Sequence, residues 1–259
     1  MINLQIKSIL KNKINLLYII LFIIVFIIIN LAINLPEIIY KYYDSKIPEE
    51  YKELARTLYI ADGNIELTNE DMEDLKKIEH IQDVKIKTLG MQDYELELTN
   101  IVIDDWKNCS KIQNILDKQG ILTGREYEDD WIKGYEKINI FMNLVVYMSI
   151  IIGTFTILIS YINILKNEKE NHKLLYILGY SKSKIRYIAC IQILAITIIG
   201  FFIGIIIFDI IFQYVIPNIL NIELLQDMYK SIIINALVTI IPLFIAIGKS
   251  TSHIKDFKI

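Results

Sequence analysis

The sequence predicts a membrane protein with four transmembrane α-helices and a small extracellular α/β domain between the first two helices. The chain contains four uncharged runs of about 20 residues, the length that spans the ~30 Å hydrocarbon core at ~1.5 Å per residue. A charged stretch separates the first run from the other three. The expected division is 1–36 for the N-terminus and first helix, 37–137 for the extracellular domain, and 138–259 for the remaining helices.

The first two runs differ in length. The first, Ile14 to Pro36, exceeds the apolar region of a cleaved signal peptide and lacks a small-residue cleavage site, which favours a retained helix. The second, Ile138 to Leu165, has 28 uncharged residues, or roughly 42 Å of helix. Because this is longer than a bilayer needs, we expect its outer end to join the extracellular domain through Trp131 to Lys137.

The last two runs and the segment between them contain an acidic residue and two prolines that bear on where the helices end or bend. The third, Tyr187 to Phe208, places Asp209 at the far interface rather than at the bilayer centre, so a hydrated carboxylate is favoured over a proton relay. Pro217 is expected to break the chain. The fourth run, Ser231 to Ile247, contains Pro242 as a predicted kink.

The distribution of lysine and arginine predicts the topology. Short cytoplasmic loops carry an excess of basic residues. One side of the predicted layout has twelve of them, against only Lys230 in the short loop 209–230 on the other side. Both termini and the middle loop are therefore expected in the cytoplasm of a multi-pass cell-membrane protein. The twelve are Lys7, Lys11, Lys13, Lys166, Lys169, Lys173, Lys182, Lys184, Arg186, Lys249, Lys255 and Lys258.

The extracellular segment predicts mixed α/β structure. Thr68 is a helix cap with Glu70 and Asp71 in the first turn and Leu67 as a staple, and this helix should reach about Ile78. Alternating polar and apolar residues at 84–87 and 94–98 predict two half-buried strands. A second helix is expected over 106–116, and Asp129-Asp130 should begin the helix that enters the membrane. The sequence shows no ligand site in this domain.

No pattern in the sequence predicts catalysis, a metal or a cofactor. His80, His172 and His253 lack ligand spacing, and the two cysteines, Cys109 and Cys190, fall on different sides and cannot pair. The run 248–250, Gly-Lys-Ser, imitates the end of a phosphate-binding loop but lacks the required earlier glycine and strand. We expect a non-enzymatic chain that does not hydrolyse nucleotide and does not bind nucleic acid.

The middle loop, residues 166–186, has the most specific pattern. Leu174, Leu175 and Leu178 share one face of a short helix, Gly179 can end that helix in the left-handed conformation, and Ser181 can cap the next. The result would be an amphipathic helix at the cytoplasmic surface. On the residues alone, a helix resting on lipid headgroups is an equal alternative.

This loop resembles that of the FtsX/MacB-like permeases of ABC transporters, including the Gram-positive antimicrobial-peptide permeases. The resemblance rests on Leu175, on Leu178-Gly179-Tyr180-Ser181 and on Ile185. The family's Glu-Ile pair falls on Asn171-His172, a departure in which Glu170 takes the place of the carboxylate. The layout of one helix, an extracellular domain and three helices also matches, as do segments 67–71, 81–84 and 120–127.

The resemblance implies a permease subunit acting by mechanotransmission on peptide or lipid-linked substrates. Two permease chains would pair, as a homodimer or heterodimer, and a separate cytoplasmic ATPase would dock on each middle loop. An FtsX-type division regulator that activates an extracellular cell-wall hydrolase is the alternative, and a membrane sensor without an ATPase is a third. The resemblance implies these ATPase-coupling residues: Lys169, Glu170, Leu174, Leu175, Leu178, Gly179, Tyr180 and Ser181.

Overall fold

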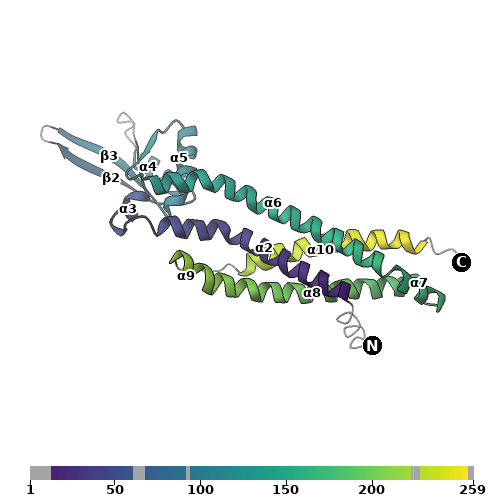
Figure 1. Ribbon diagram of the computed structural model, residues 1–259. Helices are drawn as coiled ribbons and strands as arrows, with labels where there is room; N and C mark the ends of the chain where they lie inside the picture. The colour runs from purple at the N-terminus through teal and green to yellow at the C-terminus, as the bar shows by residue number, and fades with distance from the viewer. Residues whose placement is uncertain (1–12, 61–67, 92–93, 223, 225–227, 256–259) are drawn as a thin grey trace. The chain divides into compact units, whose positions relative to one another are not determined.

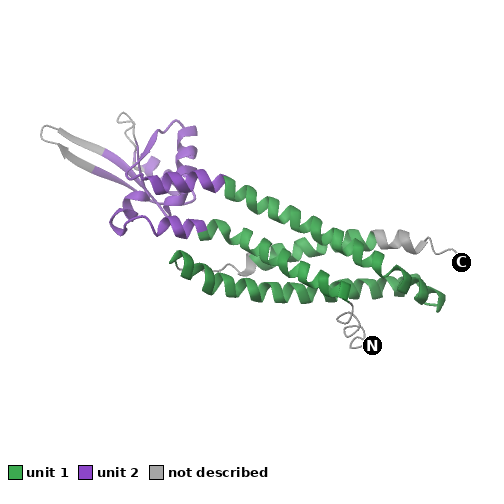
Figure 2. Cartoon of the chain, in the orientation of Figure 1, with its two compact units in different colours: residues 1–38, 141–259 green, residues 39–140 purple. Residues whose placement is uncertain are grey.

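The computed structural model describes residues 13–60, 68–91, 94–222, 224 and 228–255. The chain divides into two compact units (Figures 1 and 2): unit 1 comprises residues 1–38 and 141–259, and unit 2 comprises residues 39–140. The sequence predicted changes near residues 37 and 137. Leu67, Lys7, Lys11 and Lys258, to which the sequence assigned a staple and positive charge, lie outside the described residues.

Unit 1 is made of long apolar helices. Four helices in the described part of the chain are long and apolar enough to cross a membrane, which makes this a membrane protein. They are α2 (Lys13–Asp44), α6 (Asp130–Asn167), α8 (Lys182–Ile210) with its continuation, and α10 (Met228–Lys255). A short helix, α7 (Lys169–Ile177), lies between α6 and α8.

The expected break at Pro217 is wrong. Helix α8 continues through a π-helical segment, η3 (Ile211–Val215), into α9 (Ile216–Leu220), and Pro217 lies in the first turn of α9. The π-helical segment directly before Pro217 changes the local hydrogen-bond pattern, so a residue without an N–H is accommodated there. The helix ends instead at Asn221, whose left-handed φ of 54° allows its N–H to bond the Pro217 carbonyl at 2.7 Å.

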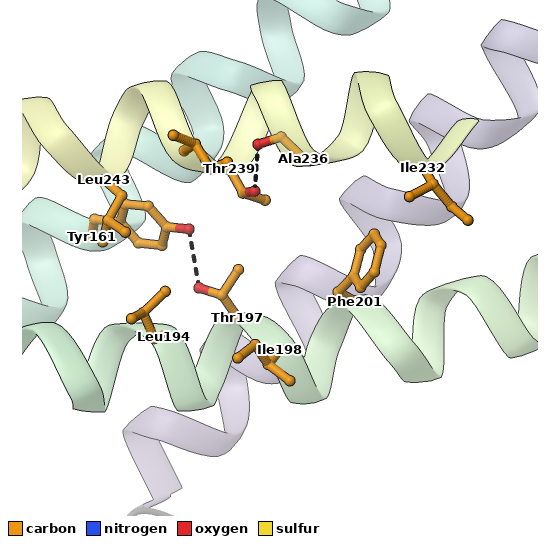
Figure 3. Close-up of a pocket in the computed structure, with 10 residues that line it drawn as sticks. Tyr161, Leu194, Thr197, Ile198, Phe201, Ile232, Ala236, Thr239 and Leu243 are labelled. Atoms are coloured by element: carbon orange, nitrogen blue, oxygen red, sulfur yellow. Dashed lines mark hydrogen bonds between the residues drawn. The ribbon is translucent and has the colours of Figure 1, made fainter. Parts of the chain in front are cut away.

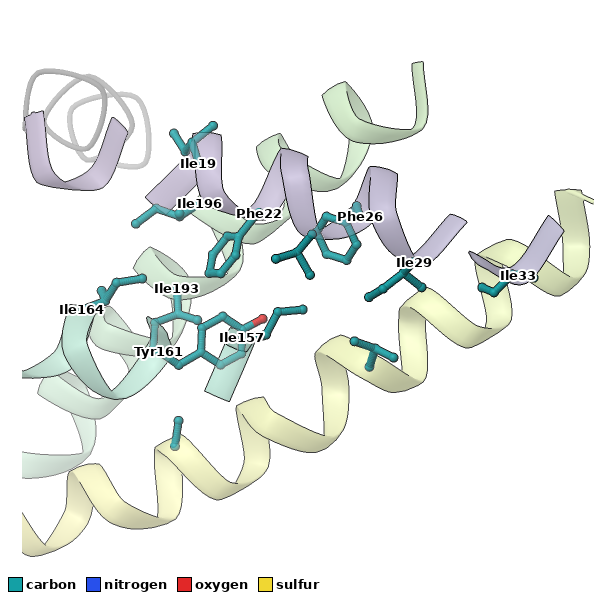
Figure 4. Close-up of a cluster of buried hydrophobic side chains, with 13 residues drawn as sticks. Ile19, Phe22, Phe26, Ile29, Ile33, Ile157, Tyr161, Ile164, Ile193 and Ile196 are labelled. Atoms are coloured by element: carbon teal, nitrogen blue, oxygen red, sulfur yellow. The ribbon is translucent and has the colours of Figure 1, made fainter. Parts of the chain in front are cut away.

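The core of unit 1 is built around α2. Figure 4 shows Phe22 pointing toward Tyr161, Ile157 and Ile193, which come from α6 and α8. Two glycines of α8, Gly200 and Gly204, let its backbone approach α2 closely. A methyl group on Gly200 would lie 2.7 Å from Cβ of Phe22, so the contact requires a residue without a side chain.

Unit 2 contains a four-stranded antiparallel sheet in the order β2-β3-β1-β4. The strands are β1 (Thr57–Ile60), β2 (Ile81–Met91), β3 (Tyr94–Ile103) and β4 (Thr123–Arg125). The helical elements are η1 (Glu49–Tyr51), α3 (Lys52–Ala55), α4 (Asn69–Lys76), η2 (Trp106–Asn108) and α5 (Cys109–Lys118). Six side chains of its core are almost fully buried: Leu58, Ile101, Ile103, Ile112, Leu116 and Ile132.

The two predicted strands and the predicted helices of unit 2 are confirmed, and strands β1 and β4 are additional. Thr68 caps α4 in a capping box: its hydroxyl accepts the Asp71 N–H, and Asp71 accepts the Thr68 N–H at 2.9 Å. Asp129 likewise caps α6 by accepting the Ile132 N–H at 2.8 Å. Both caps follow from residues three positions apart, which is why the sequence could predict them.

Candidate coupling site

Helix α7 connects two membrane-length helices through a single intervening residue on its N-terminal side. Helix α6 ends at Asn167 and α7 begins at Lys169, with Glu168 between them. The Glu168 carboxylate accepts a 2.6 Å hydrogen bond from the side-chain amide of Asn171, and its carbonyl accepts the His172 N–H. The connection is therefore a tight turn of the helical chain rather than a loop.

The C-terminal end of α7 is a sharp, fully bonded turn. Gly179 has φ of +87°, its N–H bonds the Tyr176 carbonyl, and the Tyr180 N–H bonds the Leu175 carbonyl at 3.0 Å. This pair of bonds is the Schellman arrangement, which a side chain at the left-handed position would strain. Ser181 then caps α8 by accepting the Lys184 N–H at 3.4 Å. The predicted helix end and restart are both confirmed.

The outward face of α7 is apolar and uncovered in this chain. Leu174, Ile177 and Leu178 are 59%, 66% and 73% exposed. Their spacing of i, i+3 and i+4 places them on one helical face. Leu175, which the sequence grouped with this face, is half-buried, and Ile177 replaces it. The signal for Ile177 was present in the sequence as its three-residue spacing from Leu174.

The polar residues of α7 divide into exposed and buried groups. Lys169 and Glu170 are exposed, whereas His172 is only 7% exposed. Burial lowers the pKa of His172, and the nearby Glu168 carboxylate partly opposes that effect. In the permeases that this loop resembles, the position of His172 is the isoleucine of a Glu-Ile pair. Here it holds a buried imidazole whose neutral form is favoured.

Helix α6 begins inside the core of unit 2. Ile132 is fully buried there, and the Tyr135 ring packs 5.0 Å from Trp106 and 6.0 Å from Tyr40 between ring centroids. Glu136 pairs with the guanidinium of Arg125, whose side chain is only 5% exposed, and the pairing joins α6 to β4. Helix α6 is therefore one element with residues in the cores of both units.

The end of α2 is bound within unit 2 in the same way. The Tyr40 hydroxyl donates a 2.7 Å hydrogen bond to Asp105, and the indole N–H of Trp106 donates a 2.8 Å bond to Asp44. The Lys107 ammonium lies 4.1 Å from the centre of the Tyr40 ring, a cation–π distance. The sequence predicted that residues 131–137 join this domain, but it did not predict the individual contacts, because most of them join residues far apart in the sequence.

No arrangement in the described residues resembles a catalytic or metal site. No group of three His, Cys, Asp or Glu side chains there could hold a metal ion. Burial raises the pKa of the Cys109 thiol to about 12, so this cysteine is not a nucleophile at neutral pH. Residues 248–250 lie inside α10, where no phosphate-binding loop can form.

The comparison with known families locates the similarity in unit 1. Residues 143–253 match the FtsX-like permease C-terminal family. This range contains most of α6, the whole of α7 and α8, and most of α10, so the candidate coupling site lies inside the matched region. No curated protein matches the chain.

Proposed function

We propose that this protein is the permease subunit of an ABC transporter and acts by mechanotransmission. The observation that carries the proposal is the uncovered apolar face of α7, which is formed by Leu174, Ile177 and Leu178 between two membrane-length helices. A cytoplasmic ATPase with an apolar groove would bury this face. The family match over residues 143–253 supports the same class of protein.

The mechanism requires a continuous element between α7 and unit 2, and the single helix α6 supports the proposal because it includes residues of both units. Its 38 residues correspond to roughly 57 Å of helix, from the tight turn before α7 to the core of unit 2. Nucleotide-driven closure of two ATPases would move α7, and α6 would carry the motion to unit 2. Two permease chains would pair, and a peptide or lipid-linked substrate would be handled without crossing the bilayer through this chain.

The proposed topology places unit 2 outside the cell and both termini in the cytoplasm, in agreement with the excess of basic residues around α7. Single cysteines at Lys87 and Tyr180, introduced after replacement of Cys109 and Cys190, should be labelled from opposite sides of intact cells. Lys87→Cys should react with an impermeant reagent added outside. Labelling of both positions from one side would overturn this topology.

The coupling role is tested by truncating the exposed face. Leu174→Ala combined with Leu178→Ala should cost on the order of 1–3 kcal/mol of docking energy per anchor, or about 5-fold to 150-fold in affinity for the ATPase. Co-purification of the ATPase and its stimulated turnover should both fall. Ile86→Ala with Leu122→Ala is the matched control, because these exposed apolar residues lie in unit 2. Unchanged ATPase recovery at normal expression would contradict the proposal.

The turn at Gly179 gives a second, independent test. A Cβ added at this position meets no atom within 4 Å, so only the left-handed backbone restricts substitution. Gly179→Asn should retain coupling, because asparagine tolerates positive φ, whereas Gly179→Val should lose it. Equal turnover in the two variants would show that the direction of the turn is irrelevant.

An FtsX-type role is the second candidate, since the family match over residues 143–253 fits it equally. In that case unit 2 would activate a cell-wall hydrolase outside the cell. Affinity capture with the full-length protein in detergent separates the two functions. A co-purifying hydrolase would favour the regulator, and an ATPase recovered without one would favour the transporter.

A further inference from the structure

A cluster of buried polar side chains joins α2 to α10 inside the membrane-spanning unit. Asn30 and Asn34 of α2 are 1% and 5% exposed, and Ser231 and Asn235 of α10 are 5% and 0% exposed. The Asn235 amide donates a 2.8 Å hydrogen bond to Oδ1 of Asn30, and the Asn34 amide donates a 3.2 Å bond to Oγ of Ser231. Polar side chains in a membrane interior act between helices or mark a functional site.

The two bonds form a ladder with two rungs. Asn30 and Asn34 are four residues apart on α2, and Ser231 and Asn235 are four residues apart on α10. The lower-numbered residue of one helix bonds the higher-numbered residue of the other, so the two helices are antiparallel here. Each rung is one helical turn from the next, a separation of about 6 Å along the helices.

The ladder is incompletely satisfied in this arrangement. Oδ1 of Asn235 is fully buried and has no hydrogen-bond partner among the described residues. A buried acceptor left without a donor is unfavourable, because it has lost its bonds to water and gained none in return. The two ends of the Asn235 amide therefore act in opposite directions. Its oxygen destabilises the present register, whereas its nitrogen stabilises it by bonding both Asn30 and the Ser231 carbonyl.

The polar stripe of α10 continues for one more turn, to Thr239. If α10 moved by one turn along α2, Asn235 would face Asn34 and Thr239 would face Asn30, so two polar rungs would form again. The amide of Asn34 could then supply the donor that Oδ1 of Asn235 lacks. A shift in the opposite direction would place Asn235 against the buried ring of Phe26 and would leave one polar pair among the described residues, Ser231 with Asn30.

The side of α10 that faces α6 and α8 is not closely packed. A cavity of about 210 Å³ lies there, lined by side chains of all three helices. Figure 3 shows Thr239 beside this cavity, with its hydroxyl turned to the Ala236 carbonyl of its own helix, and the Tyr161–Thr197 hydrogen bond on the opposite wall. Among the described residues, the Thr239 hydroxyl therefore bonds only the carbonyl of its own helix and is available to a new partner.

We propose that α10 has two registers on α2, one helical turn apart, and that the asparagine ladder makes both of them stable positions. Packed helices change place in discrete steps of one turn because intermediate positions lose both packing and hydrogen bonds. The present register uses Ser231, and the shifted register uses Thr239. This inference goes beyond the proposed coupling to an ATPase and does not depend on it.

The distance between two spin labels in the full chain tests the two registers and leaves all the ladder residues in place. Both native cysteines are first replaced by serine. Labels are then attached at Leu17→Cys in α2 and Gly248→Cys in α10, which are exposed positions at the same end of these antiparallel helices. A shift of α10 by one turn moves its label by about 6 Å along α2. The matched control pair is Leu17→Cys with Tyr187→Cys, an exposed position of α8.

The expected result, in membranes without any ATPase, is two distances for the 17/248 pair and a single distance for the 17/187 pair. Ser231→Ala removes the bond from Asn34 that belongs to the present register, so it should increase the population at the shifted distance. Thr239→Val should reduce that population. A single 17/248 distance that neither substitution changes would overturn the proposal. Loss of coupling in the α7 variants would leave these distances unchanged, so the two proposals fail separately.

Discussion

The two units of this protein place their polar and apolar residues in opposite ways. In unit 2, Leu58, Ile101 and Ile112 are fully buried, and ion pairs such as Lys77–Asp74 lie on the surface. In unit 1, large apolar side chains such as Phe155 are 60% exposed, whereas Asn30 and Asn235 are buried. The difference follows from the solvent, since lipid does not drive apolar side chains together as water does.

The forces that hold each unit therefore differ. Unit 2 is stabilised by apolar burial, with about 25 cal/mol gained per Å² removed from water. Unit 1 is held by close backbone approach at Gly200 and Gly204 and by hydrogen bonds between side chains. The same kind of substitution should thus have different costs in the two units.

Truncation of a core leucine should have the largest effect. Leu58→Ala in β1 removes a fully buried side chain and should lower the free energy of unfolding of unit 2 by about 2–5 kcal/mol. Trp106 and Trp131 both lie in unit 2 and are the chain's two tryptophans, so tryptophan fluorescence during denaturation in detergent reports this unit alone. Leu144→Ala, at a 58% exposed position of α6, should leave helix melting by circular dichroism nearly unchanged. Equal losses of stability in the two variants would contradict the difference between the forces that hold unit 1 and unit 2.

Removal of the buried arginine should be nearly as costly. Arg125→Ala removes a buried guanidinium together with its bonds to Glu136 and Ser110, and it should destabilise unit 2 by about 3 kcal/mol in the same fluorescence assay. The control is Lys77→Ala, which breaks an exposed ion pair with Asp74 and should leave the unfolding midpoint nearly unchanged. If the two variants unfold alike, the Arg125 pair does not hold α6 in unit 2.

The sequence predicted features that depend on neighbours in the chain and missed those that depend on tertiary contacts. The apolar runs predicted the four membrane-length helices, and local spacing predicted the cap at Thr68 and the turn at Gly179. Strands β1 and β4 have only four and three residues and are too short for a periodic signal. The Asn30–Asn235 bond joins residues 205 positions apart, and nothing near either residue indicates it.

The error at Pro217 has a related cause. Proline is disfavoured within a helix because it lacks an N–H and clashes with the preceding turn, so the sequence favoured a break. The π-helical segment before it changes the local hydrogen-bond pattern, and Pro217 falls at the start of a renewed helix. At the candidate coupling site, the position of the turn was predictable, but the burial of His172 required the packing of α7.

Filling the close contact between α8 and α2 should have an intermediate effect. Gly200→Ala places a methyl group 2.7 Å from Cβ of Phe22, and overpacking of this kind costs about 1–3 kcal/mol. Gly248→Ala is the matched control in α10, where an added methyl meets no atom within 4 Å and alanine favours the helix. Thermal melting by circular dichroism in detergent should be lowered only by Gly200→Ala. A lower melting temperature for both would indicate a general intolerance of side chains.

The smallest effect concerns pH and the buried histidine of α7. Burial lowers the pKa of His172 from its ordinary value of 6.5, so the folded helix binds a proton less readily than the unfolded one. The contribution of neutral His172 to the packing of α7 is therefore complete above pH 6.5 and is lost as the pH falls through this value toward the lower folded pKa. A spin label at Leu178→Cys, after replacement of Cys109 and Cys190, should become more mobile as the pH is lowered from about 7.5 to about 5.5, a range that brackets the ordinary histidine pKa. His172→Gln cannot gain charge and should abolish the change, because glutamine stays neutral over this range. The same increase in mobility in both chains would assign the pH effect to another group, and α7 would then be held by its apolar contacts and the turn at Gly179 alone.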